Sequence, residues 1–402
     1  MNKNDALEIL KGITITSVHV KDKTHFAFVG QRFINDAAWQ HVLTYVIFYF
    51  TDKPENERWV IHELDYMTDA NSVIGVWCDK PEPLWLFGNT WDALFYTYDE
   101  DGKQIGSEQI PGQIYRGDNI KGSFNGLSDI RNGKLYAAKG LRTVWQRSGE
   151  NQWSWLNNGI PLLDYYNDDS KDSELIYDHG FWSIDGFSDN DLYACGGDGD
   201  LWHYNGTKWS QKELPTNAAL EEICCGGDGL VYIITNRETI VTGRENRWKV
   251  IEQDLTSITF EGLAWYQDRC LINTATSLYE INNGEFVESP LQKNIPCSPS
   301  HIDAKGDILL IASRSYFDVN DIHYYDGKTW HTVLTPDRPP RDPNAETEEE
   351  INEKVVKARV TLRSARSLRS IRLRMRQACH RWLWRHGRSR YGPPMCERLS
   401  CT

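Results

Sequence analysis

One kind of hairpin recurs along the first 330 residues, and this repetition constrains the fold more than any other feature. In the clearest copies, 201–209 and 322–330, an apolar-aromatic strand runs into Asn-Gly or Asp-Gly, and a tryptophan follows three residues after the glycine. Asn-Gly and Asp-Gly suit a tight hairpin because both central positions take positive φ. Looser copies end in an aromatic as well. We expect these aromatics to be structural anchors of the repeat, packed between neighbouring sheets: Trp153, Trp209, Trp248, Phe286 and Trp330.

The repeat has the period of a propeller blade. A short apolar strand precedes each hairpin, and successive anchors from Trp209 to Trp330 are 39, 38 and 44 residues apart. Repeats of this length in an aromatic-rich chain are typical of four-stranded blades, whose radial closure protects sheet edges. The sequence therefore predicts an all-β protein, a β-propeller of seven four-stranded blades. The blades are expected at 14–64, 72–111, 124–161, 181–215, 220–253, 260–291 and 299–334.

Two details of the propeller stay open at this point. The first two units are the least regular, so six or eight blades are alternatives to seven. The opening segment from Asp5 to Leu10 fits either a short capping helix or the start of the blade that closes the ring.

The charge changes sign along the chain and marks the domain organisation. Residues 354–402 contain 14 Lys and Arg and one acid, a charge of +13, so the remaining 30 basic and 56 acidic residues give 1–353 a charge of −26. We expect a propeller over 1–335, a Pro-rich and then acidic linker over 336–353, and an Arg-rich C-terminal extension over 354–402, helical or disordered. We interpret the extension as grafted on by recombination or a change of reading frame. An element that binds nucleic acid is the alternative.

An acidic insertion in the third repeat is the best candidate for a partner-binding site. It lengthens the spacing from Trp153 to Trp209 to 56 residues. An insertion in a regular repeat projects from one face, and its charge would attract a basic protein. A solvated loop is the alternative interpretation; calcium binding and catalysis come behind both. The candidate residues are Asp164, Asp168, Asp169, Asp172, Glu174 and Asp178.

Motifs of catalysis and of cofactor binding are missing from the sequence. There is no Gly-x-Ser-x-Gly, no phosphate-binding or dinucleotide loop, and no zinc-protease motif. The histidines and cysteines lack metal spacing, so we expect no metal and no cofactor. No apolar run is long enough to span a membrane, and the N-terminus lacks the pattern of a secretory signal, so we expect a cytoplasmic protein without a membrane partner.

Two resemblances follow from these residues. Residues 191–209 resemble a kelch repeat, with a strand that ends in Gly-Gly, then aromatics, then tryptophan; the WD repeat is a weaker match. In acidity, size, lack of catalytic motifs and the abrupt tail, the chain is similar to bacterial immunity proteins that neutralise polymorphic or contact-delivered toxins. That resemblance implies a protein that binds a basic toxin domain and has no enzymatic activity.

Two rival classes of function remain. A glycan hydrolase or lyase would use carboxylates from 164–200 in a central cleft, with Trp182 and Trp202 stacked on sugars. A lectin would use the same aromatics in several equivalent pockets. Converging carboxylates would favour the enzyme, repeated pockets the lectin, and a broad acidic rim the toxin binder.

Overall fold

The fold comes from a computed structural model, which describes residues 1–36, 39–64, 73–89, 93–111, 113–115, 118–120, 124–130, 133–139, 142–161, 180–253, 255, 258–313 and 321–335. Residues 33–36 and 39–41 are described by their backbone. Met1–Arg338 is one compact unit. The Arg-rich extension, 354–402, lies outside the described residues, as does the acidic insertion at 162–179.

The first four blades are antiparallel sheets of four consecutive strands. Blade 1 consists of β1 (Thr14–Val20), β2 (His25–Asp36), β3 (Trp39–Phe50) and β4 (Trp59–Leu64). Blade 2 consists of β5 (Val73–Cys78), β6 (Leu84–Asn89), β7 (Leu94–Tyr98) and β8 (Gln104–Gln109). Blade 3 consists of β11 (Phe124–Asp129), β12 (Leu135–Lys139), β13 (Thr143–Gly149) and β14 (Gln152–Trp155). Blade 4 consists of β15 (Phe181–Ser188), β16 (Asp191–Gly196), β17 (Asp200–Tyr204) and β18 (Trp209–Lys212).

The last three blades repeat this order. Blade 5 consists of β19 (Leu220–Cys225), β20 (Val231–Thr235), β21 (Ile240–Arg244) and β22 (Arg247–Ile251). Blade 6 consists of β23 (Phe260–Tyr266), β24 (Arg269–Thr274), β25 (Leu278–Asn282) and β26 (Glu285–Glu288). Blade 7 consists of β27 (His301–Lys305), β28 (Ile308–Ala312), β29 (Ile322–Tyr325) and β30 (Trp330–Leu334).

A few short elements lie outside the blades. β9 (Gln113–Tyr115) and β10 (Asp118–Ile120) form a small hairpin between blades 2 and 3. Short 3-10 helices span Glu55–Glu57, Gly197–Gly199 and Pro290–Asn294.

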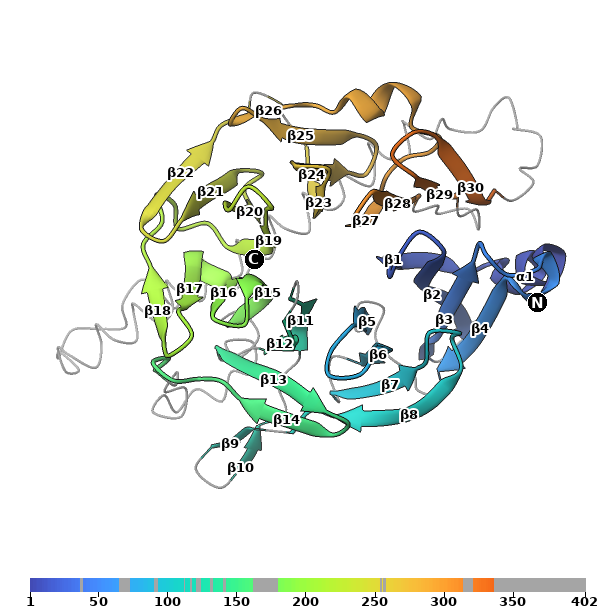
Figure 1. The fold of residues 1–402 in the computed structure, drawn as a ribbon, viewed down its shortest axis with the longest axis horizontal. Helices are drawn as coiled ribbons and strands as arrows, with labels where there is room; N and C mark the ends of the chain where they lie inside the picture. The colour runs from blue at the N-terminus through green and yellow to red at the C-terminus, as the bar shows by residue number, and fades with distance from the viewer. Residues whose placement is uncertain are drawn as a thin grey trace, which may run out of the picture. The chain divides into compact units, whose positions relative to one another are not determined.

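The seven sheets are arranged radially in a ring, with the first strand of each blade nearest the axis (Figure 1). The second strand of most blades is a continuous apolar run that is fully buried, as in β20 and β28. Such strands are covered on both faces by the sheets of neighbouring blades. The prediction of a seven-bladed, all-β propeller is confirmed.

The ring closes by side-chain packing between blades 1 and 7, since each sheet contains only strands that are consecutive in the sequence. The rings of Phe26 and Tyr324 stack with centroids 5.0 Å apart, and the main-chain nitrogen of Val20 donates to the Asp303 carboxylate at 2.7 Å. The opening segment is a helix, α1 (Lys3–Leu10), whose Ala6 and Leu10 join the same apolar cluster. The capping alternative for this segment is therefore the one observed.

The alternation of strand directions gives the propeller two different faces. One face carries the turns between the second and third strands and the connections from one blade to the next; we call it the connection face. The other carries the turns between the first and second strands and between the third and fourth; we call it the turn face. The acidic insertion joins the end of β14 to the start of β15, and both of these ends lie at the connection face.

Candidate functional site

The stem of the acidic insertion is firmly anchored, although the six predicted partner-binding residues lie outside the described residues. Trp209, fully buried in β18, donates its indole N–H to the carbonyl oxygen of Leu156 at 2.7 Å. Its main-chain nitrogen donates to the carbonyl oxygen of Asn158 at 2.8 Å. Gly159, at φ 91°, lies so close that an added Cβ would come within 2.6 Å of the Trp209 carbonyl oxygen. The insertion therefore starts from a fixed point on the connection face.

A buried carboxylate ties blades 3 and 4 together beside this stem. Asp200 lies at the start of β17 and is 5% exposed. It receives the Arg142 Nε–H at 2.5 Å, the Trp202 indole N–H at 2.8 Å and the Gln211 amide at 3.1 Å. The Arg142 guanidinium also lies over the Trp202 ring, 5.4 Å from its centroid. Trp202, which the glycan-binding alternatives would place in a sugar pocket, is thus 4% exposed and engaged with Asp200.

An exposed aromatic lies at the other end of the stem. Trp155 is the last residue of β14, is 44% exposed, and stacks on Trp145 with ring centroids 6.4 Å apart. Rigid, partly exposed aromatics are the residues most enriched among energetic hot spots of protein interfaces. Trp155 thus lies at the connection-face end of β14, nine residues before Asp164, the first acid of the insertion in the sequence.

The five predicted repeat anchors occupy the fourth strand of five different blades and do not form one site. Trp153 and Trp209 are buried, whereas Trp248, Phe286 and Trp330 are half-buried. Trp153 also donates its indole N–H to the Glu108 carboxylate of blade 2 at 3.1 Å. Each of these aromatics belongs to, or packs against, an apolar cluster of its part of the ring.

Four carboxylates near the axis link neighbouring blades, and sequence analysis missed their role. Asp303 accepts the Val20 N–H of blade 1, and Asp185 accepts the Cys225 N–H of blade 5, each at 2.7 Å. Glu222 accepts a main-chain hydrogen bond from Leu263 of blade 6, and Asp129 accepts one from Asp79 of blade 2. We call Asp129, Asp185, Glu222 and Asp303 the axial carboxylates.

Burial raises the pKa of three axial carboxylates, to about 8 for Glu222 and to about 6 for Asp303 and Asp129. Loss of hydration disfavours the charged form, and further acids near Glu222 add to this effect. Raised pKa values near the centre of a propeller are what the hydrolase alternative would need. Here each carboxylate holds a main-chain N–H of an adjacent blade, so a structural role accounts for its position.

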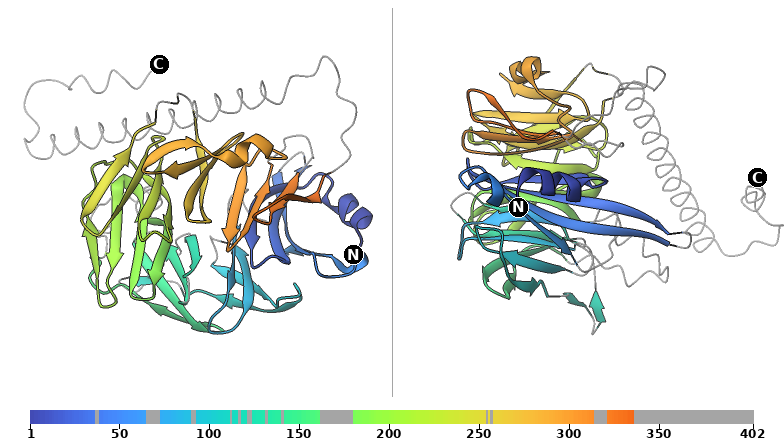
Figure 2. Two further views of the ribbon diagram at one scale, coloured as in Figure 1. Left: turned by 45° about the horizontal axis from the view of Figure 1, so that its top comes forward. Right: turned by 90° about the vertical axis from the view of Figure 1, so that its right-hand side faces the viewer.

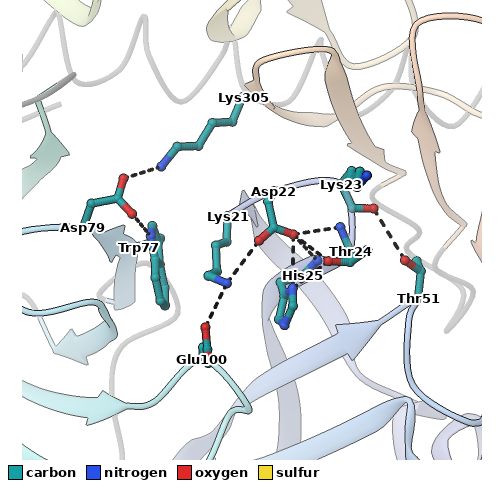
Figure 3. Close-up of polar contacts among 10 residues, drawn as sticks. All are labelled: Lys21, Asp22, Lys23, Thr24, His25, Thr51, Trp77, Asp79, Glu100 and Lys305. Atoms are coloured by element: carbon teal, nitrogen blue, oxygen red, sulfur yellow. Dashed lines mark hydrogen bonds and ion pairs between the residues drawn. The ribbon is translucent and has the colours of Figure 1, made fainter.

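A second polar cluster lies on the turn face, where blades 1, 2 and 7 meet (Figure 3). The Lys21 ammonium contacts Asp22 at 3.1 Å and Glu100 at 3.4 Å, and it lies over the Trp77 ring, 4.8 Å from the centroid. Lys305 reaches Asp79 at 3.2 Å and Asp129 at 3.7 Å. Burial alone would raise the pKa of Asp22, but hydrogen bonds from Thr24, Lys21 and His25 hold it well below its usual value. These contacts join blades 1, 2 and 7 on the turn face.

Within the described residues, no group of histidine, cysteine, aspartate and glutamate side chains could hold a metal ion. Over the same part of the chain, none of the helices is both long and apolar enough to cross a membrane.

Solved structures similar to this chain are β-propellers. The WD40 propeller domain of Doa1 superposes with a TM-score of 0.48 at 13% identity, over 78% of this chain and 94% of that one. Sqt1 of Saccharomyces cerevisiae gives 0.49 at 8% identity, over 84% of this chain and 92% of that one. Nothing about function follows from either likeness. No protein-family model matches the chain.

The fold thus defines a β-propeller with an elaborated connection face, and sequence similarity narrows the class further. A protein of Pseudomonas aeruginosa, "Immune protein Tsi7", is 32% identical over 233 residues, which cover 57% of this chain and 70% of that protein. The chain belongs to the family of the immune protein Tsi7.

Proposed function

We propose that this protein is an immunity protein, a propeller that binds a cognate toxin and neutralises it by occupying its surface. The observation that carries the proposal is the relationship to the immune protein Tsi7, 32% identical over 70% of that protein's length. The polar clusters described above have a structural role, because their side chains pair with one another or with the main chain of neighbouring blades. They therefore do not favour a catalytic function over binding.

We further propose that the toxin presents a cationic surface to the connection face. Residues 1–353 carry a charge of −26, and six of their acids belong to the insertion, which follows β14 and precedes β15 in the sequence. Charge of this kind steers a partner of opposite sign and acts mainly on the rate of association. Trp155, exposed beside the insertion, supplies an apolar contact that resists dissociation.

Association kinetics with the protein encoded by the adjacent gene, as the candidate toxin, test this proposal. The combined variant Asp168→Asn, Asp169→Asn and Asp172→Asn should bind about tenfold more slowly at low salt, and its on-rate should depend less on salt. The matched control is Asp52→Asn, Glu55→Gln and Glu57→Gln, which removes three exposed acids at a turn-face loop. This control should change the on-rate less than about threefold, because its charges lie on the far face. Equal effects of the two variants would contradict a binding site on the connection face.

A further inference from the structure

Blade 1 carries a hairpin that is much longer than its sheet. Strands β2 and β3 have 12 residues each and pair continuously from His25 and Phe50 to Asp36 and Trp39. β1 pairs with β2 only as far as Gln31, and β4 pairs with β3 only as far as Thr44. Residues 32–36 and 39–43 therefore form a two-stranded ribbon. It projects beyond the rest of the ring at the connection face, as the right-hand view of Figure 2 shows.

The base of the ribbon is held in place. Arg32 donates from Nη2 to the carbonyl oxygens of Ile9 at 2.6 Å and Lys11 at 3.0 Å, which satisfies acceptors at the C-terminal end of α1. Its guanidinium also lies 5.5 Å from the centroid of the Tyr45 ring. At Gly12, with φ 76°, the chain turns away from the line of β1. β1 therefore ends before the ribbon begins and does not pair with residues 32–36 of β2.

The orientation of the ribbon's main chain follows from the alternation of an antiparallel strand. The His25 carbonyl accepts from Lys21 N at 3.1 Å, and the Val29 carbonyl accepts from the Thr16 hydroxyl, so odd-numbered residues of β2 face β1. The pairing of β2 with β3 runs without a bulge. The N–H and C=O groups of Phe33 and Asn35 therefore point away from β3, along an edge that no described strand covers.

Within the part of the chain that the structure describes, no third strand, lysine, proline or bulge protects the β2 edge of the ribbon. Natural sheets shield exposed edges with lysine, proline, bulges or very short strands. Residues 32–43 contain neither lysine nor proline, and the ladder between them is regular. A two-stranded ribbon alone is also only marginally stable in water. Both points favour a ribbon that is completed by a partner strand.

We infer that the β2 edge of the ribbon, at Phe33 and Asn35, is a docking site for an edge strand of the toxin, which adds to blade 1 by main-chain hydrogen bonds. This inference rests on the proposed function. A strand of five residues spans only about 17 Å, so pairing alone falls well short of the roughly 800 Å² per partner of a stable interface. The occupant must therefore also cover the connection face. The net charge of −26 over residues 1–353 favours a cationic partner and disfavours a second copy of this chain.

Proline scanning of the full chain tests the site, with the protein encoded by the adjacent gene, as the candidate toxin, for the probe. Asn35→Pro removes one outward N–H and leaves the β2–β3 ladder intact, a position that tolerates proline. We expect about tenfold weaker binding, while Asn35→Ala and Gln40→Pro stay within about threefold. Gln40→Pro is the matched control, since the same alternation makes the N–H of Gln40 face outward from the opposite edge, that of β3. Unchanged thermal unfolding of each variant shows that the propeller is intact.

Hydrogen exchange of the unaltered chain gives an independent readout. The amides of Phe33 and Asn35 should exchange at least about tenfold more slowly in the complex than in the free protein. Unchanged exchange, or Asn35→Pro binding as tightly as the parent, would overturn the docking site while the proposed function stands. Self-association that Asn35→Pro abolishes would assign the edge to a second copy instead. Failure of the unaltered chain to bind the toxin would overturn both proposals.

Discussion

Arg147 and Glu108 form an ion pair that is completely buried between blades 2 and 3, with Nη2 and Oε1 2.6 Å apart. Nε of the same arginine contacts both carboxylate oxygens, at 3.2 and 3.0 Å, and Trp153 donates to the same carboxylate. The pair joins β13 to β8, so it fixes the angle between two blades at a point where water cannot compensate for a lost partner. Loss of this ion pair should therefore lower the free energy of unfolding far more than loss of an exposed pair on the turn face.

Removing one member of this pair should strongly destabilise the propeller. Arg147→Met leaves a buried carboxylate without its cation, and we expect a loss of about 3–5 kcal/mol in the free energy of unfolding. Adding Glu108→Leu should recover part of that loss. Glu100→Gln, which removes an exposed partner of Lys21, should cost less than about 1 kcal/mol. Urea unfolding measures all three variants; similar losses for Arg147→Met and Glu100→Gln would contradict the account.

Trp209 should be the most sensitive of the repeat anchors. Trp209→Ala removes a fully buried side chain and its hydrogen bond to Leu156, with an expected loss of about 3–5 kcal/mol. Trp330→Ala should lower the free energy of unfolding by less, because the half-buried Trp330 side chain has less of its surface removed from water. Trp209→Phe keeps most of the packing, so its free energy of unfolding should lie between those of the parent protein and Trp209→Ala. Denaturant unfolding that ranks Trp330→Ala as the more damaging change would reverse this assignment.

The seven blades could be predicted because their signals are local. Turns such as Asn205-Gly206 and the apolar second strands recur at blade spacing, and the expected units agree with the observed sheets to within a few residues. The pairing of Arg147 with Glu108 could not be predicted, because the two residues are 39 positions apart and meet only once the blades pack. The same holds for Lys305 and Asp79, which are separated by 226 positions.

For the candidate site, the sequence predicted the acidic charge of the insertion but not the contacts that hold its stem. The acids of the insertion are a composition signal, but the stem before them is held by Trp209 and lies beside the contact of Arg142 with Asp200, and these residues come from two blades. The long hairpin of blade 1 was hidden by its turn region, Asn35 to Trp39, which lacks the glycine that marked the other hairpins. The axial carboxylates carry no sequence motif at all, since each pairs with a main-chain N–H.

The axial carboxylate of Glu222 should make stability fall as the pH rises. Its pKa in the folded protein, about 8, lies above the ordinary value of 4.5. The folded state therefore holds its proton more tightly than the unfolded state, and stability present below about pH 4.5 is progressively lost up to about pH 8, by up to about 1.4 kcal/mol per unit of pKa difference.

Glu222→Gln should flatten this dependence. The amide oxygen can still accept from Leu263, but nothing at this position titrates. The difference in unfolding free energy between variant and parent should shift in favour of the variant from pH 5 to pH 8.5. Unfolding curves across this range measure it, and a constant difference would show that Glu222 has an ordinary pKa in the folded protein.

Residues 344–402 should be dispensable for folding. The seventh blade ends with β30 at Leu334, and the first and last blades close the ring by contacts of residues before 335. A chain ending at residue 343 should unfold within about 2 °C of the full chain. Calorimetry of both forms measures this, and a large loss would mean that the C-terminal residues contribute to the fold.

Protection of growing bacteria against the protein encoded by the adjacent gene, as the candidate toxin, tests the central claim most directly. Expressing that toxin with increasing amounts of this protein should restore growth in proportion to the ratio of the two chains and reach a plateau near equal amounts, because a binder neutralises one toxin molecule at a time. The isolated mixture should contain an intact complex of both proteins. Absence of protection at any ratio, or full protection by a small fraction of an equivalent, would contradict neutralisation by stoichiometric binding.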